Sequence, residues 1–266
     1  ALSSAASNTT CHEPLLEDTV SVIVRPFTLT GARAVAAITA AMEDYLKVIY
    51  RLSEDGHRAT TQAIASRMNV AAPSVTGMIK RLTELKLVDH ERYRSVSLTP
   101  TGEKAALEIV RHHRLLELYL AEALGFSWDQ VHDEAERLEH TISEEFEARI
   151  DRALGYPTTD PHGDPIPSVS GAITSVPDDR LSALVPGERA IISRVDDTSP
   201  EKLRYLGTMG LYPDTEVSVV ERQPFGGPLL VRVGEHEHYV GSELAETVHV
   251  ERSTIATIEN DTTPKR

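Results

Sequence analysis

The chain has 266 residues, of which 40% are hydrophobic and 26% are charged, as in ordinary soluble globular proteins. This composition excludes a disordered chain, a collagen and a membrane bundle, and the length allows two domains. The formal net charge of −14 at first argues against a nucleic-acid partner, because Lys and Arg must meet the phosphates. The one cysteine, Cys11, excludes an internal disulfide framework and a Cys-based zinc motif, and it fits a reducing cytoplasm. No apolar run is long enough to span a membrane, and no secretory signal is expected.

The segment 36–104 has the pattern of a winged helix-turn-helix, after a Ser-, Thr- and Ala-rich extension over residues 1–35 that we expect to be flexible. Apolar side chains at helical spacing predict a first helix, a short helix over Thr60–Met68 and, after a turn, a third helix. Pro73 suits the first turn of the third helix, because its missing N–H costs no hydrogen bond there. Within the extension, a short strand at Val20–Val24, where Val and Ile dominate, is the alternative to a flexible segment. Short strands are expected at Leu87–Glu91 and Ser95–Thr99, and together they form the hairpin of the wing.

Two longer helical patterns follow the wing. The first begins after the cap residue Thr99 and ends at Gly125. The second is expected to begin with a capping box formed by Ser127 and Gln130, and to run to about residue 154 with a break near residue 141. Both helices therefore lie between the wing and the proline-rich segment that comes next.

The C-terminal part of the chain changes character twice. Residues 157–179 hold five prolines and are expected to form a linker. From residue 180 to residue 252 the apolar period changes to two, which predicts a small β-barrel with one short helix, and residues 253–266 form a tail. The expected strands are Ala190–Val195, Glu216–Glu221, Leu229–Val233, His238–Val240 and Thr247–Glu251, and the expected helix is Glu201–Met209. The predicted fold is thus mainly α with a small β domain.

The negative charge is not spread evenly along the chain. Residues 57–104 contain eight basic and four acidic residues, a local charge of +4, so the other residues together carry −18. Residues 105–152 contain five basic and twelve acidic residues, which gives −7. A basic module joined to an acidic one is the pattern expected of a DNA-binding protein that also holds a cation.

The third helix is the predicted DNA-reading element. If its apolar residues face the core, its polar side chains and its N-terminus face outward, where they can meet bases and phosphates. The predicted DNA-binding residues are Pro73, Ser74, Thr76, Gly77, Lys80 and Arg81 on this helix, with Arg92 and Arg94 at the hairpin tip. The alternative is a solvated helix face beside an ordinary polar hairpin.

A stripe of His and Glu residues lies on the helical pattern after Gly125. The residues His132, Glu136, Glu139 and His140 share one helical face at the margin of an apolar stripe. His113 and Glu117 make a second pair, four residues apart, on the preceding helix. Crowded carboxylates are unfavourable unless a positive group joins them. Imidazole and carboxylate ligands without sulfur suit Mn²⁺ or Fe²⁺. The alternative is a solvated charged face paired with Arg137 and Arg114.

Several motifs resemble the diphtheria-toxin-repressor family of metal-dependent regulators. They are Met42-Glu43-Asp44-Tyr45-Leu46, Pro73-Ser74-Val75-Thr76, Leu98-Thr99-Pro100-Thr101-Gly102, His113-Arg114-Leu115-Leu116-Glu117, the stretch from Val131 to His140 and the run from Pro157 to Pro167. The stretch from Leu206 to Leu211 and Gly226-Gly227-Pro228 resemble the SH3-like domain shared with ferrous-iron transport accessory proteins. The resemblance implies a helical metal-binding and dimerisation domain at 105–156 and an SH3-like domain at 180–252.

The resemblance also implies a function. It implies a cytoplasmic homodimer, not an enzyme, that binds palindromic operator DNA when Mn²⁺ or Fe²⁺ is present and represses metal-uptake genes. Two metal sites per subunit are implied. The first uses Asp44, Glu136, Glu139 and His140, and the second uses His113, Glu117 and His132, with Asp197 and Glu201 as further candidates. Asp44 and Glu136 match the manganese-responsive branch, since the iron-responsive branch has Met and Cys there.

Some residues depart from the family pattern. Lys47 stands where manganese-branch relatives often carry a ligating Glu, which argues against a coupled binuclear centre. Gly77 stands where iron-branch relatives have a base-contacting Gln, so the operator sequence is not implied. Metal is expected to tie the first helix, through Asp44, to the Glu136–His140 segment and so fix the spacing of the two recognition helices.

Two other functions compete with this one. The pattern Glu136-x-x-Glu139-His140 resembles the His-x-x-Glu-His motif of some zinc proteases, which would make the chain a metallohydrolase. A transport-accessory module led by the SH3-like domain is the second alternative. Metal-dependent binding of operator DNA separates the regulator from both.

Overall fold

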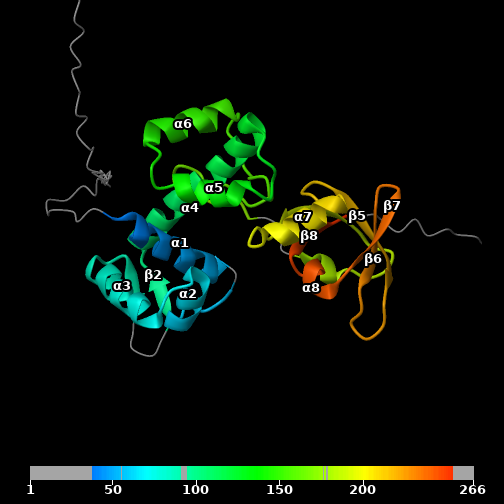
Figure 1. Cartoon of the computed structure of the whole chain (residues 1–266), viewed down its shortest axis with the longest axis horizontal. Coiled ribbons are helices and arrows are strands. Elements are labelled where there is room, and N and C mark those ends of the chain that lie inside the picture. Colours follow the sequence, from blue (N-terminus) through cyan, green and yellow to red (C-terminus); the bar gives the residue numbers. More distant parts are fainter. Residues whose placement is uncertain (1–37, 55, 91–94, 176, 178, 254–266) are drawn as a thin grey trace, which may run out of the picture. The chain divides into compact units, whose positions relative to one another are not determined.

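The computed structural model describes residues 38–54, 56–90, 95–175, 177 and 179–253 (Figure 1). The alternative strand at Val20–Val24 and the predicted DNA contacts Arg92 and Arg94 lie outside the described residues. The described residues from Thr39 onward belong to one compact unit. In the part of the chain that the structure describes, no helix is long and apolar enough to cross a membrane.

The N-terminal part of this unit is a winged helix-turn-helix, as predicted. Its elements are α1 (Ala40–Glu54), α2 (Thr61–Met68), α3 (Ala72–Glu84), β1 (Val88–His90) and β2 (Val96–Leu98). The Thr60 hydroxyl caps α2 by accepting a hydrogen bond from the Ala63 N–H at 3.1 Å. The tight turn into α3 passes through Asn69, whose φ of 53° is a left-handed conformation that Asn tolerates well. Apolar residues of α3 and α1 enter the core, which leaves the polar face of α3 exposed.

A close backbone contact fixes the wing against α4 (Pro100–Leu124). The Thr99 hydroxyl donates to the Lys86 carbonyl at 2.7 Å and also accepts from the Gly102 N–H, so one side chain joins the helix start to the wing. A Cβ atom at Gly102 would lie 1.8 Å from the Leu87 carbonyl oxygen, which no side chain can tolerate. The stretch from Thr99 to Gly102 therefore needs these residue types in order to dock the wing.

The next two helices are α5 (Val131–Leu138) and α6 (Glu144–Ala153), so the break predicted near residue 141 is confirmed. The predicted capping box is wrong. Gln130 is the N-cap of α5 without any side-chain hydrogen bond, and the Ser127 carbonyl instead accepts from the Gln130 N–H in a turn. The true side-chain cap lies at α6, where the Ser143 hydroxyl accepts from the Phe146 N–H at 3.2 Å.

The C-terminal part contains one six-stranded antiparallel sheet, with strand order β3-β8-β4-β5-β6-β7 (Figure 1). The strands are β3 (Asp179–Arg180), β4 (Arg189–Val195), β5 (Glu216–Arg222), β6 (Leu229–Val233), β7 (His236–Val240) and β8 (Val248–Arg252); the helical segments are η1 (Leu181–Ala183), α7 (Pro200–Thr208) and α8 (Ser242–Ala245). Its apolar core includes Ile192, Leu203 and Val250. The five strands that the period of two predicts are all present, and so is the predicted helix between them. The short elements β3, η1 and α8 are additional, because two to four residues carry no detectable periodicity.

The linker is not a plain connector, because it folds back on itself and docks on β4. Thr159 and Pro165 form an isolated antiparallel bridge, and the Asp160 carboxylate accepts hydrogen bonds from the backbone N–H groups of His162 and Asp164. Gly163, at φ +87°, lies against β4 so closely that a Cβ atom would be 2.1 Å from a carbonyl oxygen of the strand. This compact turn holds Asp160 and His162 in the interior.

Candidate metal centre

The first ligand group joins α1 to the segment that follows α5. The His140 Nε2 atom lies 2.7 Å from the Asp44 Oδ1 atom, and its Nδ1 atom lies 2.7 Å from the Glu43 Oε2 atom. Ligand atoms of Asp44, Glu139 and His140 all lie within 4.8 Å of one another. Helix α5 ends at Leu138, earlier than predicted, yet Glu139 keeps a helical backbone with φ −55° and ψ −30°. Glu139 and His140 therefore remain close to α1, where they contact Lys47 and Asp44.

Lys47 lies inside this first group. Its Nζ atom is 2.6 Å from the Glu136 Oε1 atom and 2.5 Å from the Glu139 Oε1 atom. Only 4% of Lys47 is exposed, and Glu139 is completely buried. In the described ion pairs Arg137 binds Glu134 and Arg114 binds Glu54, Asp160 and Asp164. The carboxylates of the stripe are therefore paired with Lys47, and the pairing with Arg137 and Arg114 that the solvated-face alternative requires does not occur.

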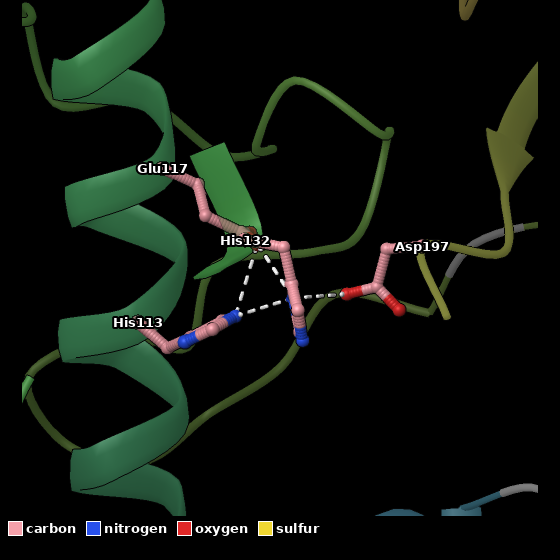
Figure 2. A group of neighbouring side chains, drawn as sticks. All are labelled: His113, Glu117, His132 and Asp197. Atoms are coloured by element: carbon pink, nitrogen blue, oxygen red, sulfur yellow. Dashed lines mark hydrogen bonds and ion pairs between the residues drawn. The ribbon is translucent and has the colours of Figure 1, made fainter. Parts of the chain in front are cut away.

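The second ligand group is His113, Glu117, His132 and Asp197 (Figure 2). His113 and Glu117 project from successive turns of α4, and Asp197 approaches His132 from the opposite side. The Glu117 Oε1 atom lies 2.9 Å from the His113 Nε2 atom and 3.1 Å from the His132 Nδ1 atom. The Asp197 Oδ2 atom lies 3.3 Å from the same His132 nitrogen. Asp197 follows β4, so this group draws on both the helical and the β part of the chain.

His113 connects the two groups. Its Nδ1 atom lies 2.6 Å from the Glu139 Oε2 atom, while its Nε2 atom faces Glu117 and His132. His113 is completely buried, so its ring has no access to solvent. One imidazole thus bridges a carboxylate of the first group and a carboxylate of the second, and a change of charge in one group is felt by the other.

A third group consists of Glu117, Asp160 and His162, all buried. The Glu117 Oε2, Asp160 Oδ2 and His162 Nδ1 atoms are buried, and each lacks a hydrogen-bond partner among the described residues. Three unsatisfied polar atoms that face one another are rare in a folded interior and call for an explanation, such as a bound ion. Asp160 and His162 are not among the residues predicted from the sequence, because the proline-rich stretch that contains them was expected to be a linker. The closely spaced Asp, His and Asp in that stretch were the available signal.

Opposite charges control the protonation of these groups. Burial works to lower the pKa of His140, but hydrogen bonds with Asp44 and Glu43 raise it to about 10. Burial likewise opposes charge on His132, yet Asp197 and Glu117 raise its pKa to about 10. Burial works to raise the pKa of Glu139, but His113 and Lys47 hold it at about 2. Without metal, imidazolium ions and Lys47 are therefore the positive partners of the buried carboxylates.

The donor set fits a divalent cation. The groups offer carboxylate oxygens and imidazole nitrogens and no sulfur, which suits Mn²⁺ and Fe²⁺ better than soft ions. The buried, unpartnered atoms of the third group provide independent support for the fit. A cavity of about 480 Å³ lies beside the first group, and its lining includes Asp44, Lys47 and Glu136. An ion can therefore reach these ligands from solvent.

Glu201 is not brought into these groups. It lies exposed in the first turn of α7, and it belongs to none of the His and carboxylate groups in the described part of the chain. Asp197, the other candidate from the β part, is 6% exposed and lies among them. The loop after β4 therefore brings Asp197, but not Glu201, to the helices.

The described residues of the predicted DNA-reading face are all exposed. They are Pro73, Ser74, Thr76, Gly77, Lys80 and Arg81, while Val75, Ile79 and Leu82 between them are buried. A Cβ atom at Gly77 would meet nothing within 4 Å among the described residues, so this position offers open space next to the predicted DNA-reading side chains. Helix α3 thus presents a polar and basic face of the kind that enters a major groove.

A winged helix-turn-helix followed by helices that carry carboxylate and imidazole groups is typical of a metal-responsive DNA-binding regulator. Comparison with known families agrees. Residues 37–96 match the iron-dependent repressor N-terminal DNA-binding domain, and residues 99–168 match the iron-dependent repressor metal-binding and dimerisation domain. Residues 180–252 match the FeoA domain.

Comparison with individual proteins also finds metal-dependent repressors. The iron-dependent repressor of Mycobacterium tuberculosis is 30% identical over 233 residues, which cover 79% of this chain and 96% of that protein. The diphtheria toxin repressor of Corynebacterium diphtheriae is 30% identical over 223 residues, which cover 79% and 96%. The solved structure of a manganese-dependent transcriptional repressor in complex with manganese is 39% identical, with a TM-score of 0.75, and the match covers 80% of this chain and all of that one. The chain belongs to the iron-dependent repressor family, the family of the diphtheria toxin repressor, whose members are metal-dependent transcriptional repressors.

Proposed function

We propose that this protein is a cytoplasmic homodimeric repressor that binds operator DNA when Mn²⁺ occupies its sites, and that it represses metal-uptake genes. Fe²⁺ is the alternative ion. The observation that carries the proposal is the contact between Asp44 and His140, because it joins the first helix of the DNA-binding domain to the metal-binding segment. The family consists of transcriptional repressors, so the proposed function is not enzymatic.

Two metal sites per subunit are proposed. The first uses Asp44, Glu136, Glu139 and His140, and the second uses His113, Glu117, His132 and Asp197. The ligand atoms of Asp44, Glu139 and His140 lie close together, and so do those of the four residues of the second site, which supports this assignment. Glu136 lies within the same distance of Glu139 and His113, so Glu139 links it to the first site. Asp160 and His162 form a further set with Glu117, so Glu117 presents one oxygen to each set.

Bound metal supplies positive charge that several carboxylates share. Asp44 holds α1 in place, and the Glu136–His140 segment holds the end of α5 against it. Because α1 packs on α3 and on α4, this contact sets the position of the DNA-reading helix relative to the helical domain. In a dimer, two such helices must be about one helical turn of DNA apart, so a fixed position favours operator binding.

The proposed DNA contacts are the exposed residues of α3 together with Arg92 and Arg94. Lys80 and Arg81 meet phosphates, while Ser74 and Thr76 lie near the N-terminus of the helix, where base edges can be read. The proposed dimer places large apolar side chains against the partner subunit. Leu124, Phe126 and Phe146 support this, because they are exposed by 57%, 38% and 42% in the single chain.

Two observations favour Mn²⁺ as the ion that this protein binds. The first group has only oxygen and imidazole ligands, and the manganese-dependent repressor is 39% identical to this chain. The relative from Mycobacterium tuberculosis is an iron-dependent repressor, which keeps Fe²⁺ as the alternative.

The proposal is tested by measuring fluorescence anisotropy of labelled DNA from upstream of a manganese or iron transporter gene, with metal-stripped protein and added Mn²⁺ or Fe²⁺. We expect Mn²⁺ to strengthen binding by at least about 100-fold, and Glu136→Ala to remove most of this effect. Glu134→Ala, which changes a half-buried glutamate on the same helix that pairs with Arg137 outside the ligand groups, is the matched control. Binding that needs no metal and ignores Glu136→Ala would contradict the proposed mechanism.

A further inference from the structure

We propose that Lys47 is a built-in positive charge of the first metal site, which limits that site to one divalent ion and weakens its affinity. This inference rests on the proposed function, since it concerns the same ligands. Its starting point is the position of the ammonium group, which lies between the two glutamates that would bind the metal. The Nζ atom contacts one oxygen of Glu136 and one of Glu139.

A buried lysine at this position requires an explanation. Lysine is almost never fully buried unless it is paired, because removing an ammonium ion from water is costly. Lys47 is only 4% exposed, and both of its described ion-pair partners are candidate metal ligands. It follows Asp44 by three residues on α1, so the same face of the helix presents a carboxylate ligand and a positive charge to one site.

The charges of the site match one divalent ion. Asp44, Glu136 and Glu139 together carry three negative charges, and Lys47 cancels one of them. The remaining two negative charges equal the charge of a single Mn²⁺ ion. A neutral residue at position 47 would leave three negative charges, and a glutamate there would leave four, which two divalent ions would balance.

The geometry also makes the ammonium a competitor. Glu139 has one oxygen bonded to Lys47, and its other oxygen lies 2.6 Å from His113. A metal ion that takes the first oxygen must share it with the ammonium or displace it. The cavity of about 480 Å³ lined by Lys47, Asp44 and Glu136 gives the displaced side chain space beside the site. The cost of displacing the Lys47 ammonium group, or of sharing the Glu139 oxygen with it, therefore offsets part of the free energy of metal binding.

The test titrates metal-stripped full-length protein with Mn²⁺ alone, by isothermal titration calorimetry and by electron paramagnetic resonance. Lys47→Met and Lys47→Gln remove the charge at similar side-chain length. We expect both to bind Mn²⁺ at one site about tenfold more tightly or better, with the number of ions unchanged, as expected for loss of a positive charge a few ångströms away. Lys47→Glu is expected to add one ion per subunit, detected as an exchange-coupled pair of Mn²⁺ ions.

The matched control is Lys202→Met, which removes a lysine from an exposed pair with Glu243 and should leave the titration unchanged. If wild-type protein already shows a coupled pair, or if the neutral variants remain folded in thermal melts and bind Mn²⁺ no more tightly, the inference is overturned. Should either neutral variant fail to fold, the ion count of Lys47→Glu decides. Absence of Mn²⁺ binding in every variant would overturn the proposed function as well, whereas normal metal-dependent DNA binding without any effect of Lys47 would overturn this inference alone.

Discussion

The two ends of the metal centre balance their charge in different ways. In the first group a lysine from α1 neutralises the carboxylates of Glu136 and Glu139. In the second group, the ion-pair partners among the described residues are histidines for Glu117, and His132 and Arg51 for Asp197. The nearby Asp160 and His162 each have a buried atom without a hydrogen-bond partner in the described part of the chain. The first group can therefore remain assembled without metal. The second group depends more on protonated histidines, because opposite charges raise the pKa of His132 to about 10.

The largest loss of stability and of metal-dependent DNA binding is expected from a substitution at Glu139, because this residue contacts both groups. Glu139→Gln removes the charge that pairs with Lys47 and His113, and leaves a buried ammonium with only Glu136. We expect the free energy of unfolding to fall by about 3 kcal/mol, since breaking a buried ion pair is strongly destabilising. Metal-dependent DNA binding should also be lost. Urea unfolding and anisotropy measure the two effects.

Glu145→Gln is the control for this change, because Glu145 makes an exposed pair with Arg149 on α6. Its effect should stay within about 0.5 kcal/mol. Equal stabilities of the Glu139 and Glu145 variants would show that the shared carboxylate does not hold the groups together.

A smaller effect is expected at Glu117, which contributes only to the second and third groups. Glu117→Gln should weaken Mn²⁺ binding at one site by about 10- to 100-fold while the other site keeps its affinity, as is typical when a metal site is perturbed. Calorimetric titration of both sites measures this, with Glu122→Gln on the exposed side of α4 as control. A loss of affinity at both sites would mean that the groups form one indivisible centre.

A still smaller loss of Mn²⁺ affinity is expected from a substitution at Asp197. Asp197→Asn removes a carboxylate that the β part of the chain places 3.3 Å from His132. We expect a loss of about tenfold in Mn²⁺ affinity at the second site, because His113, Glu117 and His132 remain. Asp214→Asn, at an exposed position with φ 65° that suits asparagine, is the control. An unchanged affinity would restrict the second site to ligands of the helical domain.

Local periodicity predicted much of the fold for a clear physical reason. A helix that covers a core repeats its apolar residues every three or four positions, so α1, α3 and α4 could be located, and the mainly helical fold with a small β domain was correct. The capping box was wrong because a Ser three residues before a Gln also fits an ordinary turn. The break after α5 was predicted near residue 141, and the helix ends slightly earlier, at Leu138, because Glu139 and His140 continue the pattern of residue types without continuing the helix.

The candidate site was less accessible to sequence reasoning, because its members come from distant segments. The pairs His113–Glu117 and His132–Glu136 could be predicted from their spacing of four residues on a helix. The position of Lys47 between Glu136 and Glu139 could not, since the residues are about 90 positions apart and only the packing of α1 brings them together. Asp160 and His162 were missed because a proline-rich segment shows no period from which a buried face could be inferred.

The finest test of the comparison between the two groups is the pH dependence of stability without metal. The pKa of His140 and that of His132 are each raised from an ordinary 6.5 to about 10. Their contribution to stability is complete below pH 6.5 and is lost as the pH rises toward 10. The pKa of Glu139 is lowered from 4.5 to about 2, so its contribution is present above pH 4.5 and is lost as the pH falls toward 2. The metal-free protein should therefore be most stable between about pH 4.5 and 6.5, and should lose stability at alkaline pH.

Urea unfolding of metal-stripped protein from pH 5 to 9 measures this slope. His132→Gln should flatten it, because one of the two imidazolium ions is gone, whereas His236→Gln on the exposed face of β7 should not. Lys47 pairs with two carboxylates of the first group, whereas Arg51 pairs only with Asp197 of the second, so the second group should account for more of the slope. His132→Gln is thus expected to flatten the slope more than His140→Gln does. The reverse order would show that the first group, despite its lysine, relies on protons as much as the second.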